Sequence, residues 1–145
     1  MQISRASFGC VYSAQRNEIF VAGGYTEGEL NKKVERYSIA EDKWTFLPDL
    51  NEYKCSMSLC LLDDSRYLYS IGGLSKVDQN IQLNTTIERL DLSNPNATWQ
   101  VMPAKLTEAA CDLGCVAISK DEILIMGGWN KNPLRNAYII KKYDG

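Results

Sequence analysis

Histidine is absent from the 145 residues of this sequence, and its absence limits the chemistry available to the chain. Without histidine there is no usual general base and no Ser-His or Cys-His nucleophile pair. The five cysteines do not occur in Cys-x-x-Cys spacing, which also disfavours a zinc site. We therefore predict a protein that is not an enzyme, with no catalytic residue, no metal and no cofactor.

Long hydrophobic runs and a surplus of basic charge are missing as well. The longest apolar runs have four or five residues, whereas a membrane-spanning helix needs about 20. The formal net charge is −2, whereas surfaces that bind nucleic acid carry clustered positive charge. The first residues lack the apolar stretch of a secretory signal, and five cysteines suit a reducing compartment. These features predict a cytoplasmic protein with no membrane or nucleic-acid partner.

Three glycine pairs divide the chain into similar units. The pairs are Gly23-Gly24, Gly72-Gly73 and Gly127-Gly128, with first glycines 49 and 55 residues apart. A short apolar, β-prone run precedes each pair, which predicts a strand that ends in a turn. These runs are 19–22, 68–71 and 123–126.

Further strands are predicted on both sides of each glycine pair. An upstream segment joined by a short polar turn predicts a hairpin, and a third strand follows downstream. In two units, a fourth strand is predicted to begin at Trp44 or Trp99 and to end near Pro48 or Pro103. The upstream strands are 8–12, 58–62 and 113–117, and the third strands are 33–39, 86–92 and 136–140.

The repeat predicts an all-β fold, a β-propeller of four-stranded antiparallel blades. No stretch has convincing helical periodicity. The expected blades are about 1–51, 52–106 and 107–145, and the third lacks its fourth strand. Propellers close with typically 4–8 blades, and each open blade face would have an area of about 350 Å². We therefore expect further blades, or another copy of the chain, to complete the ring.

The motif residues resemble those of the kelch family. In that family a glycine pair ends the second strand, an aromatic residue lies in the third, and a tryptophan opens the fourth. The resemblance implies a kelch-type propeller whose loops on one face bind partner proteins, often in a ubiquitin-ligase adaptor or a cytoskeletal protein. The matching residues are Gly23, Gly24, Tyr37 and Trp44 in the first unit, Gly72, Gly73 and Trp99 in the second, and Gly127 and Gly128 in the third.

The family pattern is incomplete in two units. The second has Leu90 in place of the aromatic residue, and the third has Tyr138 but no tryptophan. Trp44 and Trp99 are large enough to fill the space between neighbouring blades, so we expect both to be buried there.

Three cysteines recur at similar places in the repeat. Cys10, Cys60 and Cys115 precede the next glycine pair by 13, 12 and 12 residues. This spacing predicts one shared position in the first strand of each unit. Free cysteine there is expected to act as a small buried hydrophobic residue.

The loops after the glycine pairs differ in length and sequence, and variable loops on a rigid scaffold are common binding sites. We predict that they bind a partner protein. Tyrosine, tryptophan and arginine are also enriched at interaction hot spots, although Tyr25 and Trp129 could instead pack against a neighbouring blade. The candidate residues are Tyr25, Glu27, Lys76, Trp129, Asn130 and Arg135.

The sequence is also compatible with two other functions. A structural scaffold within a larger assembly would interact through blade faces and strand edges rather than through the loops. A propeller enzyme would use carboxylates with Arg36 or Arg89 near the propeller axis.

Overall fold

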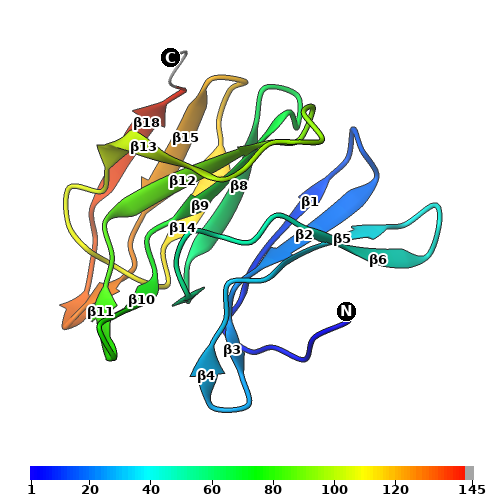
Figure 1. Ribbon diagram of the computed structural model, residues 1–145. Helices are drawn as coiled ribbons and strands as arrows, with labels where there is room; N and C mark the ends of the chain where they lie inside the picture. The colour runs from blue at the N-terminus through cyan, green and yellow to red at the C-terminus, as the bar shows by residue number, and fades with distance from the viewer. Residues whose placement is uncertain (143–145) are drawn as a thin grey trace.

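The computed structural model describes residues 1–142, and these residues form β-strands and connecting turns without a helix. They therefore contain no helix long and apolar enough to cross a membrane. Three main antiparallel sheets lie side by side (Figure 1). This arrangement confirms the expected all-β fold of propeller-like blades.

The first sheet has the strand order β1-β2-β5-β6, and the second has the order β8-β9-β12-β13. The third sheet has the order β14-β15-β18 within the described residues. The first-sheet strands are β1 (Gly9–Ser13), β2 (Glu18–Ala22), β5 (Val34–Ser38) and β6 (Lys43–Leu47). The second-sheet strands are β8 (Ser58–Leu62), β9 (Tyr67–Ile71), β12 (Thr86–Asp91) and β13 (Gln100–Lys105). The third-sheet strands are β14 (Gly114–Ala117), β15 (Glu122–Met126) and β18 (Ala137–Lys141).

The strands expected from the sequence occur within one or two residues of their expected positions, but the fourth strand of the second sheet differs. It begins at Gln100, directly after Trp99, and continues through Pro103 to Lys105. Proline is tolerated there because β13 is the outer strand of its sheet.

Three further short hairpins follow the glycine pairs, where the sequence predicted only loops. We call them the first hairpin, β3 (Tyr25–Thr26) with β4 (Glu29–Leu30), the second, β10 (Leu74–Val77) with β11 (Asn80–Leu83), and the third, β16 (Trp129–Asn130) with β17 (Asn132–Pro133). The second hairpin is extended by β7 (Lys54–Cys55), which pairs with β10.

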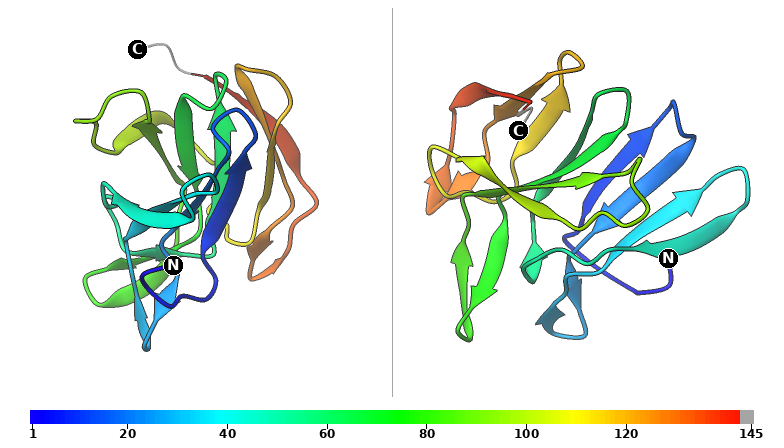
Figure 2. Two further views of the ribbon diagram at one scale, coloured as in Figure 1. Left: turned by 90° about the vertical axis from the view of Figure 1, so that its right-hand side faces the viewer. Right: turned by 45° about the horizontal axis from the view of Figure 1, so that its top comes forward.

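The first strands of the three sheets meet at the centre of the molecule. Strand β8 contacts both β1 and β14, and the remaining strands of each sheet extend outward (Figures 1 and 2). Arg36 and Arg89 lie on β5 and β12, the third strands from this centre. Their expected position near the propeller axis is therefore wrong.

Two hydrophobic clusters hold the sheets together. Phe20 of the first sheet packs in one cluster with Leu68 and Trp99 of the second. Ile71 of the second sheet packs in the other with Ile125 of the third. Each sheet therefore buries one face against its neighbour, as stacked propeller blades do.

The two motif tryptophans lie in different surroundings. Trp99 is 4% exposed in the cluster between the first two sheets, and its indole N–H donates to Pro48 O at 2.9 Å. Trp44 is only half-buried and stacks on Tyr37 at 4.9 Å. Trp44 lies on the face of the first sheet that is turned away from the second sheet, so its burial between neighbouring blades stays a prediction.

The cysteine register inferred from the sequence is also wrong. Cys10 pairs with Val21 and Cys115 pairs with Ile125, each partner two residues before its glycine pair, whereas Cys60 pairs with Tyr69, three residues before. A shift of one residue along a strand moves a side chain to the opposite face of the sheet. Cys10 is exposed and Cys60 is buried, so the three cysteines do not share one position.

A buried ion pair recurs in the first two sheets and was not expected from the sequence. Arg5 Nη2 lies 2.7 Å from Glu35 Oε2, and Lys54 Nζ lies 2.7 Å from Glu88 Oε2. Each basic side chain enters from the segment before the first strand and meets a glutamate on the third strand. The second pair connects the chain entering the second sheet to the middle of that sheet.

The third sheet has uncharged residues at both positions of this ion pair. By strand register, Ala110 occupies the place of Arg5 and Lys54, and Tyr138 occupies the place of the glutamates. Burial raises the pKa of Tyr138 there. Because both charges are replaced together, no buried charge is left unpaired at this position.

Candidate functional site

The three hairpins that follow the glycine pairs form one end of the molecule, which we call the hairpin face (Figure 1). Both glycines of each pair have positive φ, 60° and 102° at Gly23 and Gly24, a conformation that side chains disfavour. This turn directs the chain out of the sheet. Each hairpin then returns to the carbonyl of the second glycine, as in Asn31 N to Gly24 O at 3.0 Å.

Backbone hydrogen bonds fix the first residue of the first and third hairpins. Tyr25 forms two backbone hydrogen bonds with Ala6, at 2.8 and 3.0 Å. Trp129 forms two with Cys111, at 2.8 and 3.2 Å. Yet the side chains of Tyr25 and Trp129 are 40% and 45% exposed. The fold thus holds two exposed aromatic side chains on anchored backbone, which lowers the entropy that binding through them would cost.

A groove of about 520 Å³ lies between the first two hairpins. Tyr53, 47% exposed, lies in this groove together with Glu29 and Lys76, and Lys76 Nζ lies 3.1 Å from Glu29 Oε2. Lys32 Nζ lies 5.3 Å from the centre of the Tyr53 ring. An aromatic surface beside charges of both signs can bind an extended peptide through stacking and ion pairs.

The remaining candidate residues occupy different positions on the hairpin face. Glu27 is exposed at the turn of the first hairpin, with a φ of 50°. Asn130 donates to Glu108 Oε1 at 3.0 Å, and Arg135 is exposed between β17 and β18. In Figure 2 the third hairpin stands apart from the first two. The structure therefore brings Lys76 to the first hairpin and leaves Trp129, Asn130 and Arg135 as a separate group.

The sequence did not point to Tyr53 or Lys32, and Glu29 lies in the first loop predicted to bind but was not among the candidate residues; all three contribute to the groove or its rim. Tyr53 precedes β7, in the connection between the first two sheets, and not in a loop after a glycine pair. An exposed aromatic residue in a polar connection is the signal that could have identified it.

A propeller enzyme could use a metal-binding group or an arginine, and both can be looked for in the part of the chain that the structure describes. Within residues 1–142, no three His, Cys, Asp or Glu side chains form a group that could hold a metal ion. Arg36 Nη1 lies 3.4 Å from Glu18 Oε1, and Arg89 lies over the Tyr67 ring at 4.5 Å. Both arginines thus contact neighbouring side chains of their own sheets.

The sheets, their central first strands and their interlocking faces define a segment of a β-propeller. A family model described as the kelch motif matches residues 6–51. The chain is 34% identical over 101 residues to an F-box/kelch-repeat protein of Arabidopsis thaliana, an alignment that covers 68% of this chain and 26% of the relative. The chain belongs to the kelch-repeat family.

Other relatives combine kelch repeats with different domains. The chain is 28% identical over 102 residues to a RING finger domain and kelch repeat-containing protein of Dictyostelium discoideum, covering 70% of this chain and 10% of the relative. It is 37% identical over 78 residues to Kelch-like protein 40 of Mus musculus, covering 54% and 12%. The chain thus spans only a tenth to about a quarter of the length of these relatives.

Proposed function

We propose that this chain is a non-enzymatic protein-interaction module that binds a partner protein through the hairpin face. The observation that carries the proposal is the groove between the first two hairpins, which Tyr53 lines together with the Lys76–Glu29 ion pair and where Tyr53 is exposed. The anchored aromatic residues Tyr25 and Trp129 extend the same face. Membership of the kelch-repeat family supports a protein as the ligand of this surface.

Alanine variants on this face test the proposal against a matched control. Tyr12 is an exposed tyrosine of β1, away from the hairpins, and serves as the control. Removing a hot-spot aromatic residue is expected to weaken partner capture about tenfold or more. We expect this for Tyr53→Ala, and for Trp129→Ala combined with Arg135→Ala if the third hairpin takes part, while Tyr12→Ala leaves capture unchanged.

The scaffold alternative predicts the opposite ranking. If the chain interacts through its sheet faces, Tyr12→Ala weakens capture and Tyr53→Ala does not. That result would contradict binding through the hairpin face. Purified wild-type and variant chains, compared by titration against the captured partner, give the affinities needed.

We also propose that the open faces of the first and third sheets are covered by further kelch blades. Val116, Met126 and Ile139 of the third sheet are exposed hydrophobic residues. Their counterparts in the first sheet, Val11, Ala22 and Arg36, lie on the face turned toward the second sheet. A face built to pack on a neighbour is therefore open in the third sheet.

Backbone contacts between sheets support the same occupant. Gly24 N donates to Lys54 O at 2.8 Å, and Gly73 N donates to Ala110 O at 2.9 Å, so the first two glycine pairs each bond the segment that enters the next sheet. A Cβ added at Gly72 would lie 2.7 Å from Ala110 O, whereas one at Gly127 would meet its nearest atom at 3.6 Å. Gly127 thus has space at the position where Gly23 and Gly72 contact the segment that enters the next sheet.

Solution size measurements test this second proposal. If another copy supplies the missing blades, light scattering gives a dimer, and Met126→Glu shifts it toward monomer. If further blades of a longer polypeptide cover the faces, the chain alone associates non-specifically or is unstable. A compact, stable monomer of this chain would contradict both forms.

A further inference from the structure

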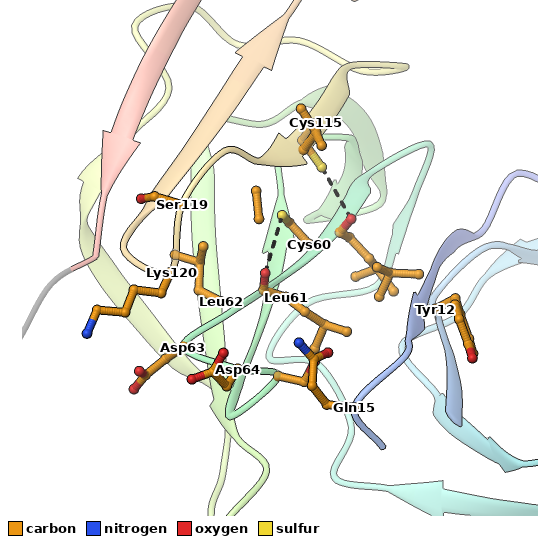
Figure 3. A pocket seen from close by; sticks show the side chains of 15 residues that line it. Tyr12, Gln15, Cys60, Leu61, Leu62, Asp63, Asp64, Cys115, Ser119 and Lys120 are labelled. Atoms are coloured by element: carbon orange, nitrogen blue, oxygen red, sulfur yellow. Dashed lines mark hydrogen bonds between the residues drawn. The ribbon is translucent and has the colours of Figure 1, made fainter. Parts of the chain in front are cut away.

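Two cysteines from neighbouring sheets face each other near the centre of the molecule. Cys60 lies on β8 and Cys115 on β14, and the two strands contact each other. The one-residue difference in register turns Cys60 toward the third sheet and Cys115 toward the second. Figure 3 shows both sulfur atoms directed into the space between the strands.

The two thiols border a cavity of about 420 Å³, which is large enough to admit a small molecule. Cys60 is buried and Cys115 is partly exposed. Cys115 Sγ donates to Leu59 O at 3.2 Å, and the long contact from Cys60 Sγ to Leu61 O measures 3.9 Å. Both sulfur atoms are therefore held by neighbouring backbone on the cavity wall.

The surroundings make the Cys60 thiol differ from the other four. Interaction with the Cys115 side chain lowers the pKa of Cys60, and the same interaction raises the pKa of Cys115. Burial raises the pKa values of Cys10 and Cys55, and burial with Asp112 raises that of Cys111 to about 11. The thiolate is the reactive form, so Cys60 is the expected nucleophile.

We propose that Cys60 and Cys115 are a reactive thiol pair that forms a disulfide between the second and third sheets on exposure to a low-molecular-weight disulfide. The Cys60 thiolate attacks one sulfur of the reagent, forms a mixed disulfide and releases one thiolate. Cys115 then loses its proton to this thiolate or to solvent and attacks the Cys60 sulfur. The second half of the reagent leaves as a thiolate, so two protein thiols are oxidised and one disulfide is reduced to two thiols.

The equivalent contact between the first two sheets shows that packing does not require sulfur at these positions. Strand register places Val11 where the second sheet has Cys60, and Leu59 where the third has Cys115. An aliphatic pair therefore fills this place in one contact and a thiol pair in the other. The thiol pair is a local feature of the second contact, not a requirement of the repeated fold.

Oxidised glutathione is the probe for the test, applied to the folded full chain carrying Cys10→Ser, which removes the exposed thiol. Peptide mapping is expected to find a Cys60–Cys115 disulfide, formed at least about tenfold faster than any modification of Cys111, whose higher pKa lowers its thiolate fraction. In the same background, Cys115→Ser should trap glutathione on Cys60. Cys60→Ser should leave Cys115 unmodified.

A second readout follows the effect on the folded protein. The cross-link should raise the midpoint of thermal unfolding by about 5 °C or more, and a reducing agent should reverse the shift. The variants alone should melt close to the parent, which shows that they fold. Modification of Cys60 without a disulfide, cross-linking of Cys60 to another cysteine, or no faster reaction than at Cys111 would each overturn the proposal.

Discussion

Substitution of Lys54 by methionine should destabilise the fold far more than removal of a surface lysine. Lys54 Nζ lies 2.7 Å from Glu88 Oε2 and 2.8 Å from Thr86 Oγ1, and the two charged side chains are 0% and 1% exposed. Methionine keeps most of the apolar volume but leaves the Glu88 carboxylate buried without its cation. Breaking a buried pair in this way costs about 3–5 kcal/mol, a large part of the roughly 5–15 kcal/mol that stabilises a typical domain.

The double variant Lys54→Met with Glu88→Leu separates the unpaired charge from the lost packing. Because desolvation offsets much of the attraction in a buried pair, removal of both charges should recover most of the lost stability. The third sheet already has uncharged residues at these places, Ala110 and Tyr138. The matched control is Lys33→Met, since Lys33 forms an exposed pair with Asp49 that should contribute less than about 1 kcal/mol.

Urea unfolding followed by circular dichroism gives the required free energies of unfolding. We expect a loss of about 3–5 kcal/mol for Lys54→Met, with most of it recovered in the double variant. A cost for Lys54→Met no greater than that for Lys33→Met would contradict the effect of an unpaired buried charge. A double variant as unstable as the single one would contradict it as well.

Three further predictions concern packing, backbone conformation and pH. Trp99→Ala should lower the free energy of unfolding in urea by about 3–5 kcal/mol. Trp44→Ala should lower it clearly less, because Trp44 is only half-buried, and equal losses would contradict this difference in burial. Gly73→Ala should be more destabilising than Gly127→Ala, because a Cβ at Gly73 would lie 2.6 Å from a backbone oxygen, and equal melting temperatures would argue against this contact. Burial raises the pKa of Asp91, but hydrogen bonds from arginine and serine outweigh it and lower the pKa from 3.8 to about 2. This depressed pKa adds stability above pH 3.8 that is lost as the pH falls toward 2. Asp91→Asn should therefore lower the free energy of unfolding by about 0.5–1 kcal/mol near pH 6 and by little near pH 2. Urea unfolding measured at a series of acidic pH values checks this.

Strand positions were predictable from the sequence because they depend on local patterns. Apolar β-prone runs that end at Gly23, Gly72 and Gly127 give the second strands, and polar turns before them give the hairpins. The hairpins after the glycine pairs were missed because strands as short as Tyr25–Thr26 have too few residues for an alternating pattern.

Features that depend on pairing across the fold were not predictable in this way. The position of Cys60 relative to Cys115 depends on hairpin register, which spacing to the glycine pairs does not give. The Lys54–Glu88 pair joins residues 34 positions apart, and neither residue stands out in its own segment. Tyr53 reaches the hairpin face because the connection between two sheets passes beside the second hairpin.

Photo-cross-linking tests most directly whether the hairpin face binds a partner. A photoreactive amino acid is placed at Tyr53 in one variant and at Tyr12 in another, and each is irradiated with the captured partner. Binding through the hairpin face predicts a cross-linked partner from position 53 and none from position 12, with mapped peptides on the groove between the first two hairpins. Cross-linking from position 12 but not from position 53 would contradict it.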